Sequence, residues 1–288
     1  MSETKLLWIL ERVVSKATEY LRRVQGKRGI ERVYWKRGLD ETRAIDWDVE
    51  ELIIKELERA KLNALVVSEE RDPLTIGNED KLEYIIVVDP LDGSLNYLVG
   101  IPYSSVSIAV AKYKDNATLN DVELGVIQSV FTGDVYVGVK GKGVMVNGVK
   151  LMSERRVSQG LILGYLNDGA YNVMFEVEKV TGPFKFRSLG CASLDLMLVV
   201  KGEADLFVDL RSKLRVTDLA AAYVILKEAG CIVTDGQGSP IDASISTLSH
   251  VPSVIVFRNK NVYEKYRFIY DLAKKFIFSN QPSRKESG

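Results

Sequence analysis

The chain has 288 residues, enough for two domains and for a large hydrophobic core that needs no disulfide or structural metal. Its 39 basic and 39 acidic residues give a formal charge of zero, which excludes a protein that grips nucleic acid over its whole surface. One histidine, His250, and two cysteines exclude zinc ribbons and iron–sulfur clusters and argue against a histidine-dependent nucleophile.

The number of cysteines and the hydropathy of the sequence indicate the cellular compartment of the protein. Two sparse cysteines are typical of a reducing compartment, so we expect a cytoplasmic protein. No run of about 20 apolar residues is present, and the apolar start of the chain is soon interrupted by charges, so we expect neither a membrane span nor a signal peptide.

The first half is predicted to contain two helices followed by strands. Apolar residues recur at helical spacing over 3–25 and again from Asp46 to Ala60, and the basic stretch 27–44 between them is predicted to be irregular. Strands are then predicted at 64–68, 84–88, 104–113, 122–130 and 134–139. Asn147-Gly148 is a hairpin signal.

In the second half, segments with the hydrophobic period of strands alternate with segments with the hydrophobic period of helices. Strands are predicted near 161–165, 184–187, 205–208, 231–234 and 253–257, and helices near 171–178, 192–201, 217–229 and 261–276. This pattern indicates a layered α/β or α+β fold. We predict two units, 1–150 with the main chemistry and 151–278 closing the pocket, and a disordered tail at 279–288.

The stretch Val87-Val-Asp-Pro-Leu-Asp-Gly-Ser-Leu-Asn96 contains the strongest candidate site. Asp89 and Asp92 follow a buried strand, and carboxylates so close repel each other unless a divalent cation lies between them. Oxygen ligands of this kind are those that Mg²⁺ prefers. Gly93 permits a tight turn, and a helix that starts at Ser94 would present free N–H groups to a phosphate. Taken alone, an Asp-Pro turn after a strand is equally compatible with a structural role.

Further acidic residues stand at the ends of predicted elements. Glu69 and Glu70 follow the strand at 64–68, and Glu69 precedes Asp89 by twenty residues, so neighbouring strands would bring both acids to one sheet edge. Asp218 begins an apolar helix and Asp46 begins the second helix. Each alone is more typical of a solvated loop or a helix cap. Their combination indicates a magnesium site.

These motifs resemble the inositol monophosphatase superfamily. The resemblance is carried by Asp89-Pro-Leu-Asp-Gly-Ser, by the preceding Glu69-Glu70, and by Asp218-Leu-Ala-Ala with Glu228-Ala-Gly. Thr42-Arg-Ala-Ile-Asp46 with Glu50 and Lys140-Gly-Lys-Gly143 with Asn147-Gly148 resemble further family segments. The similarity runs from about residue 40 to residue 236 and includes the archaeal enzymes that act on both inositol monophosphate and fructose 1,6-bisphosphate.

The resemblance implies an α-β-α-β-α sandwich of the α+β class, a homodimer, and two or three Mg²⁺ per active site. Carried over by position, the first metal would be held by Glu69, Asp89 and the carbonyl of Leu91, and the second by Asp89, Asp92 and Asp218. Glu70 would lie nearby and orient water or touch a further metal.

The resemblance also implies direct in-line hydrolysis without a phosphoenzyme. Ser94 with Glu69 would position and deprotonate the attacking water, with Asp46 close by. The N–H groups of Gly93, Ser94 and Leu95 would hold the phosphate, and Asp92 would also contact the substrate.

Three arginines are candidates for recognising a second phosphate, because a guanidinium pairs with phosphate oxygens through two parallel hydrogen bonds. Arg211 stands seven residues before Asp218, where inositol-selective members of the family tend to carry an acid. Arg187 is a second candidate, and Arg215 is a third, weaker one. Each is also compatible with a surface arginine or with a partner of Asp205 or Asp209. The two stronger arginines, with Gly190-Cys-Ala192, resemble the pocket of the archaeal bisphosphatases, with Ala192 in its wall.

The sequence therefore predicts a Mg²⁺-dependent phosphatase that hydrolyses fructose 1,6-bisphosphate and also inositol 1-phosphate. A 3′-phosphonucleotide or NADP phosphatase of the same fold is an alternative. A non-catalytic regulator that binds RNA or RNA polymerase, and a metal-stabilised structural protein, are alternatives of another class. The intact set of acidic residues argues against the regulator, whereas a metal-stabilised structural protein would bind metal without turnover.

Overall fold

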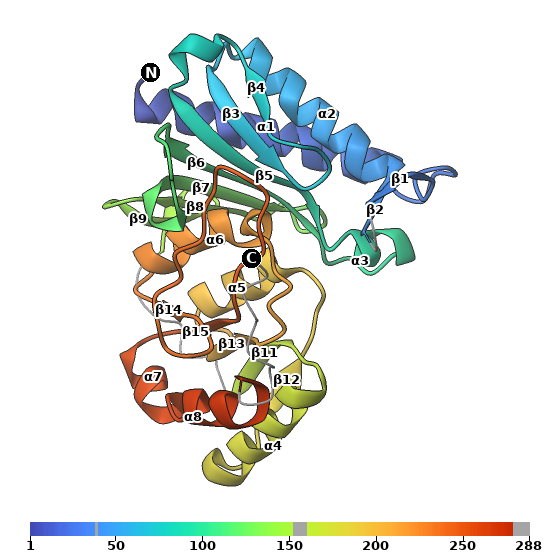
Figure 1. The fold of residues 1–288 in the computed structure, drawn as a ribbon. Coiled ribbons are helices and arrows are strands. Elements are labelled where there is room, and N and C mark those ends of the chain that lie inside the picture. The colour runs from blue at the N-terminus through green and yellow to red at the C-terminus, as the bar shows by residue number, and fades with distance from the viewer. Residues whose placement is uncertain (38–39, 152–159, 279–288) are drawn as a thin grey trace, which may run out of the picture.

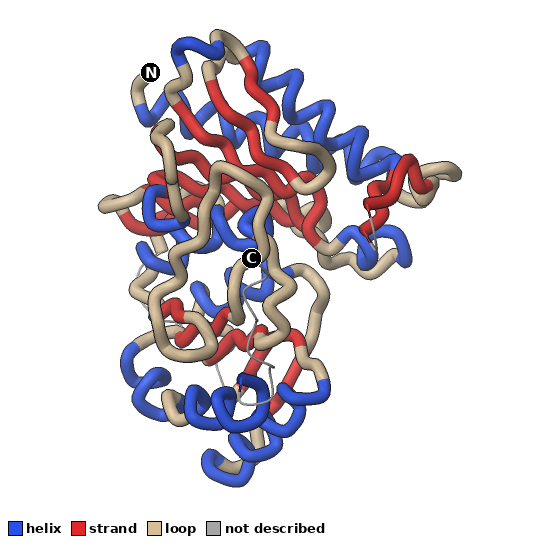
Figure 2. Tube along the Cα trace, viewed as in Figure 1, coloured by secondary structure: helices blue, strands red, loops and turns tan. Residues whose placement is uncertain are grey.

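The computed structural model describes residues 1–37, 40–151 and 160–278, and helical layers alternate with sheets along its length (Figure 1, Figure 2). Three hydrophobic cores fill the spaces between the layers: one lies between the N-terminal helices and the first sheet, one between the two sheets, and one between the second sheet and the outer helices. The five-layer α-β-α-β-α fold is thereby confirmed.

The first layer consists of α1 (Glu3–Val24) and α2 (Ala44–Arg59). The buried face of α1 repeats at helical spacing, as its sequence predicted. Between the helices, β1 (Val33–Arg37) and β2 (Asp40–Arg43) form an antiparallel hairpin. The prediction that 27–44 is irregular was wrong, because the strand-forming Val33, Tyr34 and Trp35 outweigh the basic residues around them.

The first sheet has eight strands in the order β10-β9-β8-β7-β6-β5-β3-β4. They are β3 (Ala64–Ser68), β4 (Leu74–Ile76), β5 (Tyr84–Asp92), β6 (Ser105–Lys112), β7 (Val122–Ser129), β8 (Val135–Val139), β9 (Gly143–Val146) and β10 (Val149–Lys150). β3 and β5 are parallel and adjacent, with Ser68 opposite Val88. The carboxyl ends of these two strands therefore meet at one edge, as predicted. The hairpin predicted at Asn147-Gly148 joins β9 to β10.

The second sheet has the order β12-β11-β13-β15-β14. Its strands are β11 (Leu161–Tyr165), β12 (Lys185–Arg187), β13 (Leu206–Asp209), β14 (Ile232–Thr234) and β15 (Val254–Phe257). All five lie where strands were predicted. In the first sheet, the sequence predicted no strand at the position of the short edge strand β4.

The remaining helices fill the middle and outer layers. α5 (Ala192–Val200) and α6 (Val216–Glu228) lie between the sheets, and α4 (Asp168–Thr181), α7 (Lys260–Tyr266) and α8 (Ile269–Ala273) cover the outer face. Short helices are α3 (Ser94–Val99), η1 (Glu79–Lys81), η2 (Leu119–Asp121) and the π-helical turn η3 (Lys274–Phe278). The single helix predicted over 261–276 was wrong, because α7 ends at Tyr266 and α8 starts afresh after Phe268.

Helix α6 packs on the first sheet where β7 and β8 carry glycines. A Cβ atom at Gly125 would lie 2.5 Å from the carbonyl oxygen of Ala221, and one at Gly138 would lie 2.8 Å from Cα of Ile225. The helix backbone therefore approaches the sheet more closely than any residue with a side chain would allow.

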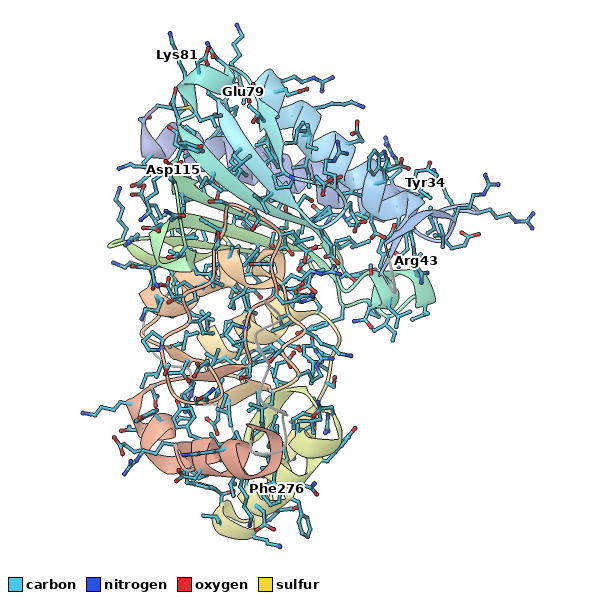
Figure 3. The ribbon with its side chains drawn as sticks, viewed as in Figure 1. Tyr34, Arg43, Glu79, Lys81, Asp115 and Phe276 are labelled. Atoms are coloured by element: carbon cyan, nitrogen blue, oxygen red, sulfur yellow. The ribbon has the colours of Figure 1, made fainter. Side chains whose placement is uncertain are left out.

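Figure 3 shows the length of this stack: Glu79 and Lys81 lie at one end, and Phe276 lies on the outer helical layer at the other. The division into units at residue 150 stays a prediction, and the tail at 279–288 lies outside the described residues. Within the described ranges, no helix is both long enough and apolar enough to cross a membrane.

Candidate active site

Three carboxylates meet at the edge of the first sheet. Glu69 follows β3, Asp89 lies in β5, and Asp218 lies in the first turn of α6; each offers an oxygen within 4.8 Å of the others. Asp89 Oδ1 accepts the N–H of Leu91 at 3.1 Å, whereas its buried Oδ2 accepts no hydrogen bond. A buried carboxylate oxygen without a donor lacks the compensation it had in water. A bound cation would therefore stabilise this cluster of carboxylates.

Burial and mutual repulsion raise the pKa values of these acids. The pKa of Asp89 lies well above its ordinary value, through burial first and then the charges of Asp92 and Asp218. Burial, followed by the charge of Asp92, raises the pKa of Asp218 to about 7. Carboxylate oxygens are the ligands that a hard divalent cation such as Mg²⁺ prefers, and such a cation would offset the repulsion between these buried acids. The predicted ligands Glu69, Asp89 and Asp218 are thus brought together.

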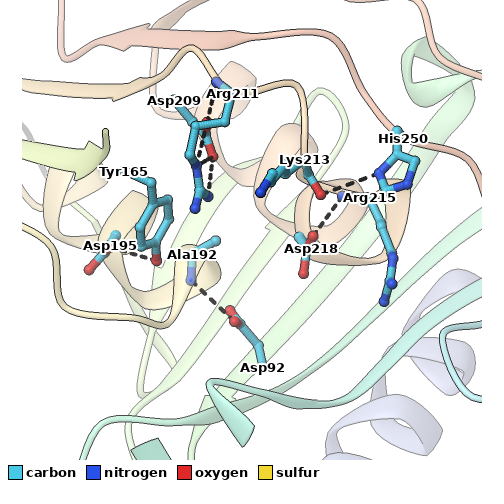
Figure 4. Close-up of polar contacts among 10 residues, drawn as sticks. All are labelled: Asp92, Tyr165, Ala192, Asp195, Asp209, Arg211, Lys213, Arg215, Asp218 and His250. Atoms are coloured by element: carbon cyan, nitrogen blue, oxygen red, sulfur yellow. Dashed lines mark hydrogen bonds and ion pairs between the residues drawn. The ribbon is translucent and has the colours of Figure 1, made fainter. Parts of the chain in front are cut away.

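Arg215 lies beside this cluster of carboxylates. Its guanidinium pairs with Glu69, and its backbone N–H donates to Asp218 Oδ2 at 2.6 Å (Figure 4). The structure therefore places Arg215 beside the predicted metal ligands, where it offsets part of their negative charge. Its predicted contact with substrate stays a prediction.

Asp92 points to the start of helix α5. Its carboxylate accepts N–H groups from Ser193 at 2.7 Å and Ala192 at 3.2 Å, and the thiol of Cys191 lies 3.2 Å away (Figure 4). Asp92 is therefore outside the three-carboxylate group, although its charge reaches Asp89. The structure brings Asp92 and Ala192 together, and their predicted contacts with metal and substrate stay predictions.

The turn at Gly93 starts α3 at Ser94, as predicted. Gly93 has φ of 80°, and a Cβ there would lie 3.0 Å from the carbonyl oxygen of Tyr103 and 3.1 Å from Cβ of Cys191. Only glycine fits this backbone in this space. The first N–H groups of α3, which include those of Ser94 and the exposed Leu95, have no acceptor within the helix.

Two other predicted acids, Asp46 and Glu70, lie outside the three-carboxylate group. Asp46 is in the first turn of α2, where its carboxylate accepts the N–H of Arg43, and burial raises its pKa to about 7. Arg43, not Asp46, is the capping residue of this helix. Glu70 is buried, and its charge contributes to the raised pKa of Asp89. The roles predicted for Asp46, Glu70 and the Leu91 carbonyl stay predictions.

Sequence reasoning missed the clamp that holds the loop after Glu70. Arg71 Nε donates to Glu50 at 2.6 Å, Nη2 donates to Glu51 at 2.6 Å, and the guanidinium lies 4.3 Å from the ring centre of Trp47. All three partners belong to α2, so Arg71 fixes the end of β3 to that helix. The spacing of Trp47, Glu50 and Glu51 on one helical face was the available signal.

The three predicted arginines differ in their surroundings. Arg211 forms a bidentate pair with Asp209, one of its two predicted partners, through Nε at 3.1 Å and Nη2 at 2.7 Å. Arg187 ends β12, is exposed, and donates to the carbonyl of Phe186, which matches the alternative of a surface arginine. The pair with Asp209 likewise matches the alternative given for Arg211, so a substrate contact by either arginine stays a prediction.

A second missed feature is the buried carboxylate of Asp195 in α5. Tyr103 and Tyr165 each donate a hydroxyl to it, both at 3.0 Å. Burial raises the pKa of Asp195 to about 7, against the lowering effect of both hydroxyls. Asp195 lies within the apolar run after Cys191. The only feature of the sequence that indicates its burial is that a single acid interrupts this run.

Comparison with known proteins agrees with this geometry. The profile of the inositol monophosphatase family matches residues 3–275. A fructose-1,6-bisphosphatase/inositol-1-monophosphatase of Methanothermobacter thermautotrophicus is 35% identical over 230 residues, which cover 78% of this chain and 81% of that protein. A bifunctional NADP phosphatase/NAD kinase of Methanococcus maripaludis is 32% identical over 239 residues, covering 78% of this chain and 42% of that longer protein.

Solved structures show the same fold. A Pyrococcus horikoshii protein described as similar to inositol-1 monophosphatase superimposes with a TM-score of 0.76 at 28% identity, covering 94% of this chain and 98% of its own. The family profile includes α1, which lies outside the segment on which the resemblance was noticed. With the profile spanning nearly the whole chain and the acidic motifs assembled at one sheet edge, this chain belongs to the inositol monophosphatase family.

Proposed function

We propose that this chain is a Mg²⁺-dependent phosphomonoesterase that hydrolyses fructose 1,6-bisphosphate and inositol 1-phosphate by direct attack of water. The observation that carries the proposal is the convergence of Glu69, Asp89 and Asp218 within 4.8 Å of one another, next to a glycine turn that opens a helix. Relatives at 33–35% identity bear one or both of these activities in their names.

Two or three Mg²⁺ would be held by Glu69, Asp89, Asp92 and Asp218, with Glu70 and the carbonyl of Leu91 completing the set. When bound, the ions supply positive charge to the phosphate oxygens and lower the pKa of a water molecule. The raised pKa values of Asp89 and Asp218 support this assignment, because a bound cation would favour the ionised forms that burial and mutual repulsion disfavour.

The chain's own groups would orient the reacting atoms. The N–H groups of Gly93, Ser94 and Leu95 would hold the phosphate at the start of α3, where the helix leaves them without acceptors. Glu69 and the hydroxyl of Ser94 would hold the attacking water in line and accept its proton, and Asp46 would orient them. Asp92 would be kept in place by the N–H groups at the start of α5.

Arg211 would bind the second phosphate of the bisphosphate. Its side chain is 25% exposed, so part of it is accessible, and Asp209 holds it in one orientation. The bisphosphate carries more negative charge than inositol 1-phosphate, and an ordered guanidinium favours that additional charge. We predict that the preference between the two substrates depends on this residue.

A second candidate function is NADP or 3′-phosphonucleotide phosphatase activity. It is favoured by the relative at 32% identity whose name includes NADP phosphatase. We also propose a homodimer and a cytoplasmic location; both cysteines are free and buried, in agreement with a reducing compartment.

Phosphate release from fructose 1,6-bisphosphate, inositol 1-phosphate, NADP and 3′-phosphoadenosine 5′-phosphate tests the proposal. Wild type is assayed with Mg²⁺ and with EDTA, and Asp89→Asn serves as the inactive control. We expect Mg²⁺-dependent release led by the first two substrates. A clear lead of either nucleotide would establish the second candidate, and no release from any substrate would refute both.

A further inference from the structure

The Asp195 carboxylate of α5 links the loop before β6 to the end of β11. Its side chain is fully buried, and each oxygen accepts one hydroxyl: Oδ1 accepts Tyr103 and Oδ2 accepts Tyr165, both at 3.0 Å. Two matched donors leave neither oxygen unsatisfied, so the network fixes the direction of both tyrosines. Tyr165 ends β11, and the edge-to-face contact of its ring with Phe207, 5.9 Å between centroids, restricts it further.

The ring of Tyr165 supports Arg211. The guanidinium carbon lies 4.5 Å from the ring centre, within the range of a cation–π interaction. Asp209 accepts hydrogen bonds from Nε and Nη2 of the guanidinium. Nη1 donates to no residue in the described part of the chain. One edge of the guanidinium is thus bound to Asp209, one face rests on Tyr165, and the Nη1 end remains available.

In the view of Figure 4, the guanidinium of Arg211 extends toward Ala192, whose backbone N–H donates to Asp92. Because Asp209 already uses the Nε edge, substrate can meet Arg211 only through its Nη groups. The carboxylate of Asp209 and the ring of Tyr165 together set the direction of those donors.

We propose that Tyr165 is a positioning residue for substrate selection: its hydroxyl, held by Asp195, orients the ring that directs the Nη1 end of Arg211 toward the second phosphate. This inference rests on the proposed function. It assigns a role to a buried hydroxyl that lies outside the metal cluster and that contacts no reacting atom.

The chain offers a matched control. Tyr165→Phe and Tyr103→Phe each remove one hydroxyl from the same carboxylate, but only Tyr165 contacts Arg211. Steady-state kinetics of both variants are measured on fructose 1,6-bisphosphate and on inositol 1-phosphate. Tyr165→Phe is expected to raise KM for the bisphosphate about fivefold, the effect of one modest hydrogen bond, with kcat and the inositol phosphate KM nearly unchanged. Tyr103→Phe is expected to leave the ratio of the two KM values unchanged.

A double variant distinguishes the positioning of Arg211 by Tyr165 from a general loosening of the fold. Arg211→Gln is expected to raise KM for the bisphosphate by itself, and adding Tyr165→Phe to it is expected to produce no further increase. Asp195→Asn provides the same KM comparison if Tyr165→Phe does not fold. Equal effects of the two tyrosine variants on both substrates, or an additive effect in the Arg211→Gln background, overturn the inference alone. Absence of phosphate release by wild type from either substrate refutes the proposed function and the inference together.

Discussion

The acidic cluster is predicted to destabilise the protein when no metal is bound. Asp218 has a pKa of about 7 in the folded protein, against 3.8 for the ordinary carboxyl. In this pH range the folded metal-free protein therefore binds a proton that the unfolded chain has released, so its free energy of unfolding falls as pH rises from about 4 to about 7. Replacing Asp218 by asparagine removes that dependence.

The size of the effect follows from the geometry. Two unit charges 4.8 Å apart, the limit for the oxygens of Glu69, Asp89 and Asp218, repel by about 3 kcal/mol at an effective dielectric constant of about 20. Arg215 offsets part of the charge of Glu69, so we take roughly 2–3 kcal/mol as the gain from Asp218→Asn at pH 8. For a chain of this length that corresponds to an increase in Tm of about 5–10 °C.

Thermal unfolding in EDTA and in saturating Mg²⁺, at pH 5 and pH 8, measures this. Wild type should lose stability between pH 5 and pH 8 in EDTA and regain it with Mg²⁺; Asp218→Asn should be more stable than wild type in EDTA at pH 8 and respond less to Mg²⁺. Asp115→Asn, an exposed acid at the outer edge of the first sheet, is the control (Figure 3). If Asp218→Asn unfolds at a lower temperature than wild type in EDTA at pH 8, the electrostatic reasoning fails.

Three further changes test other contacts. Arg211→Ala leaves the buried Asp209 without its cation, so the free energy of unfolding in urea should fall by about 2 kcal/mol, and Asp209→Asn in the same chain should restore most of it. Gly93→Ala places a Cβ 3.0 Å from a carbonyl oxygen at positive φ; we expect a loss of about 2 kcal/mol with phosphatase activity nearly abolished, and near-normal turnover would contradict the close approach. Arg71→Gln releases the loop after Glu70 from Glu50, so the Mg²⁺ concentration for half-maximal activity should rise about tenfold while KM for substrate changes little.

Much of the fold could be predicted because hydrophobic periodicity reports burial directly. The strands at 64–68 and 84–88 were apolar enough to be recognised. That Glu69 and Asp89 would meet at one edge was expected only if these strands are neighbours, and their parallel pairing meets that condition. The hairpin at 33–43 could not be predicted in this way. Val33 and Tyr34 of β1 are exposed, and the segment shows no alternation between apolar and polar residues that would indicate a half-buried strand.

The candidate site shows the same division. Glu69, Asp89 and Asp218 were predicted because acidic residues at the ends of apolar segments are conspicuous in the sequence. Asp195 and Arg71 were missed because their roles depend on partners far away in the chain: Tyr103 lies 92 residues from Asp195, and Glu50 lies 21 residues from Arg71. Pairings at such separations are set by the packing of layers, which no local pattern records.

The two glycines beneath α6 have a consequence for the distance between the metal ligands. Asp218 stands at the start of this helix, whereas Glu69 and Asp89 belong to the sheet on which the helix rests. The absence of side chains at Gly125 and Gly138 sets how deeply the helix sits, and therefore sets the gap that a cation must bridge. A single methyl group added at either glycine would act as a spacer and widen that gap without touching a ligand. The size of the cation that this site would accept is therefore expected to depend partly on two sheet residues that bear no functional group.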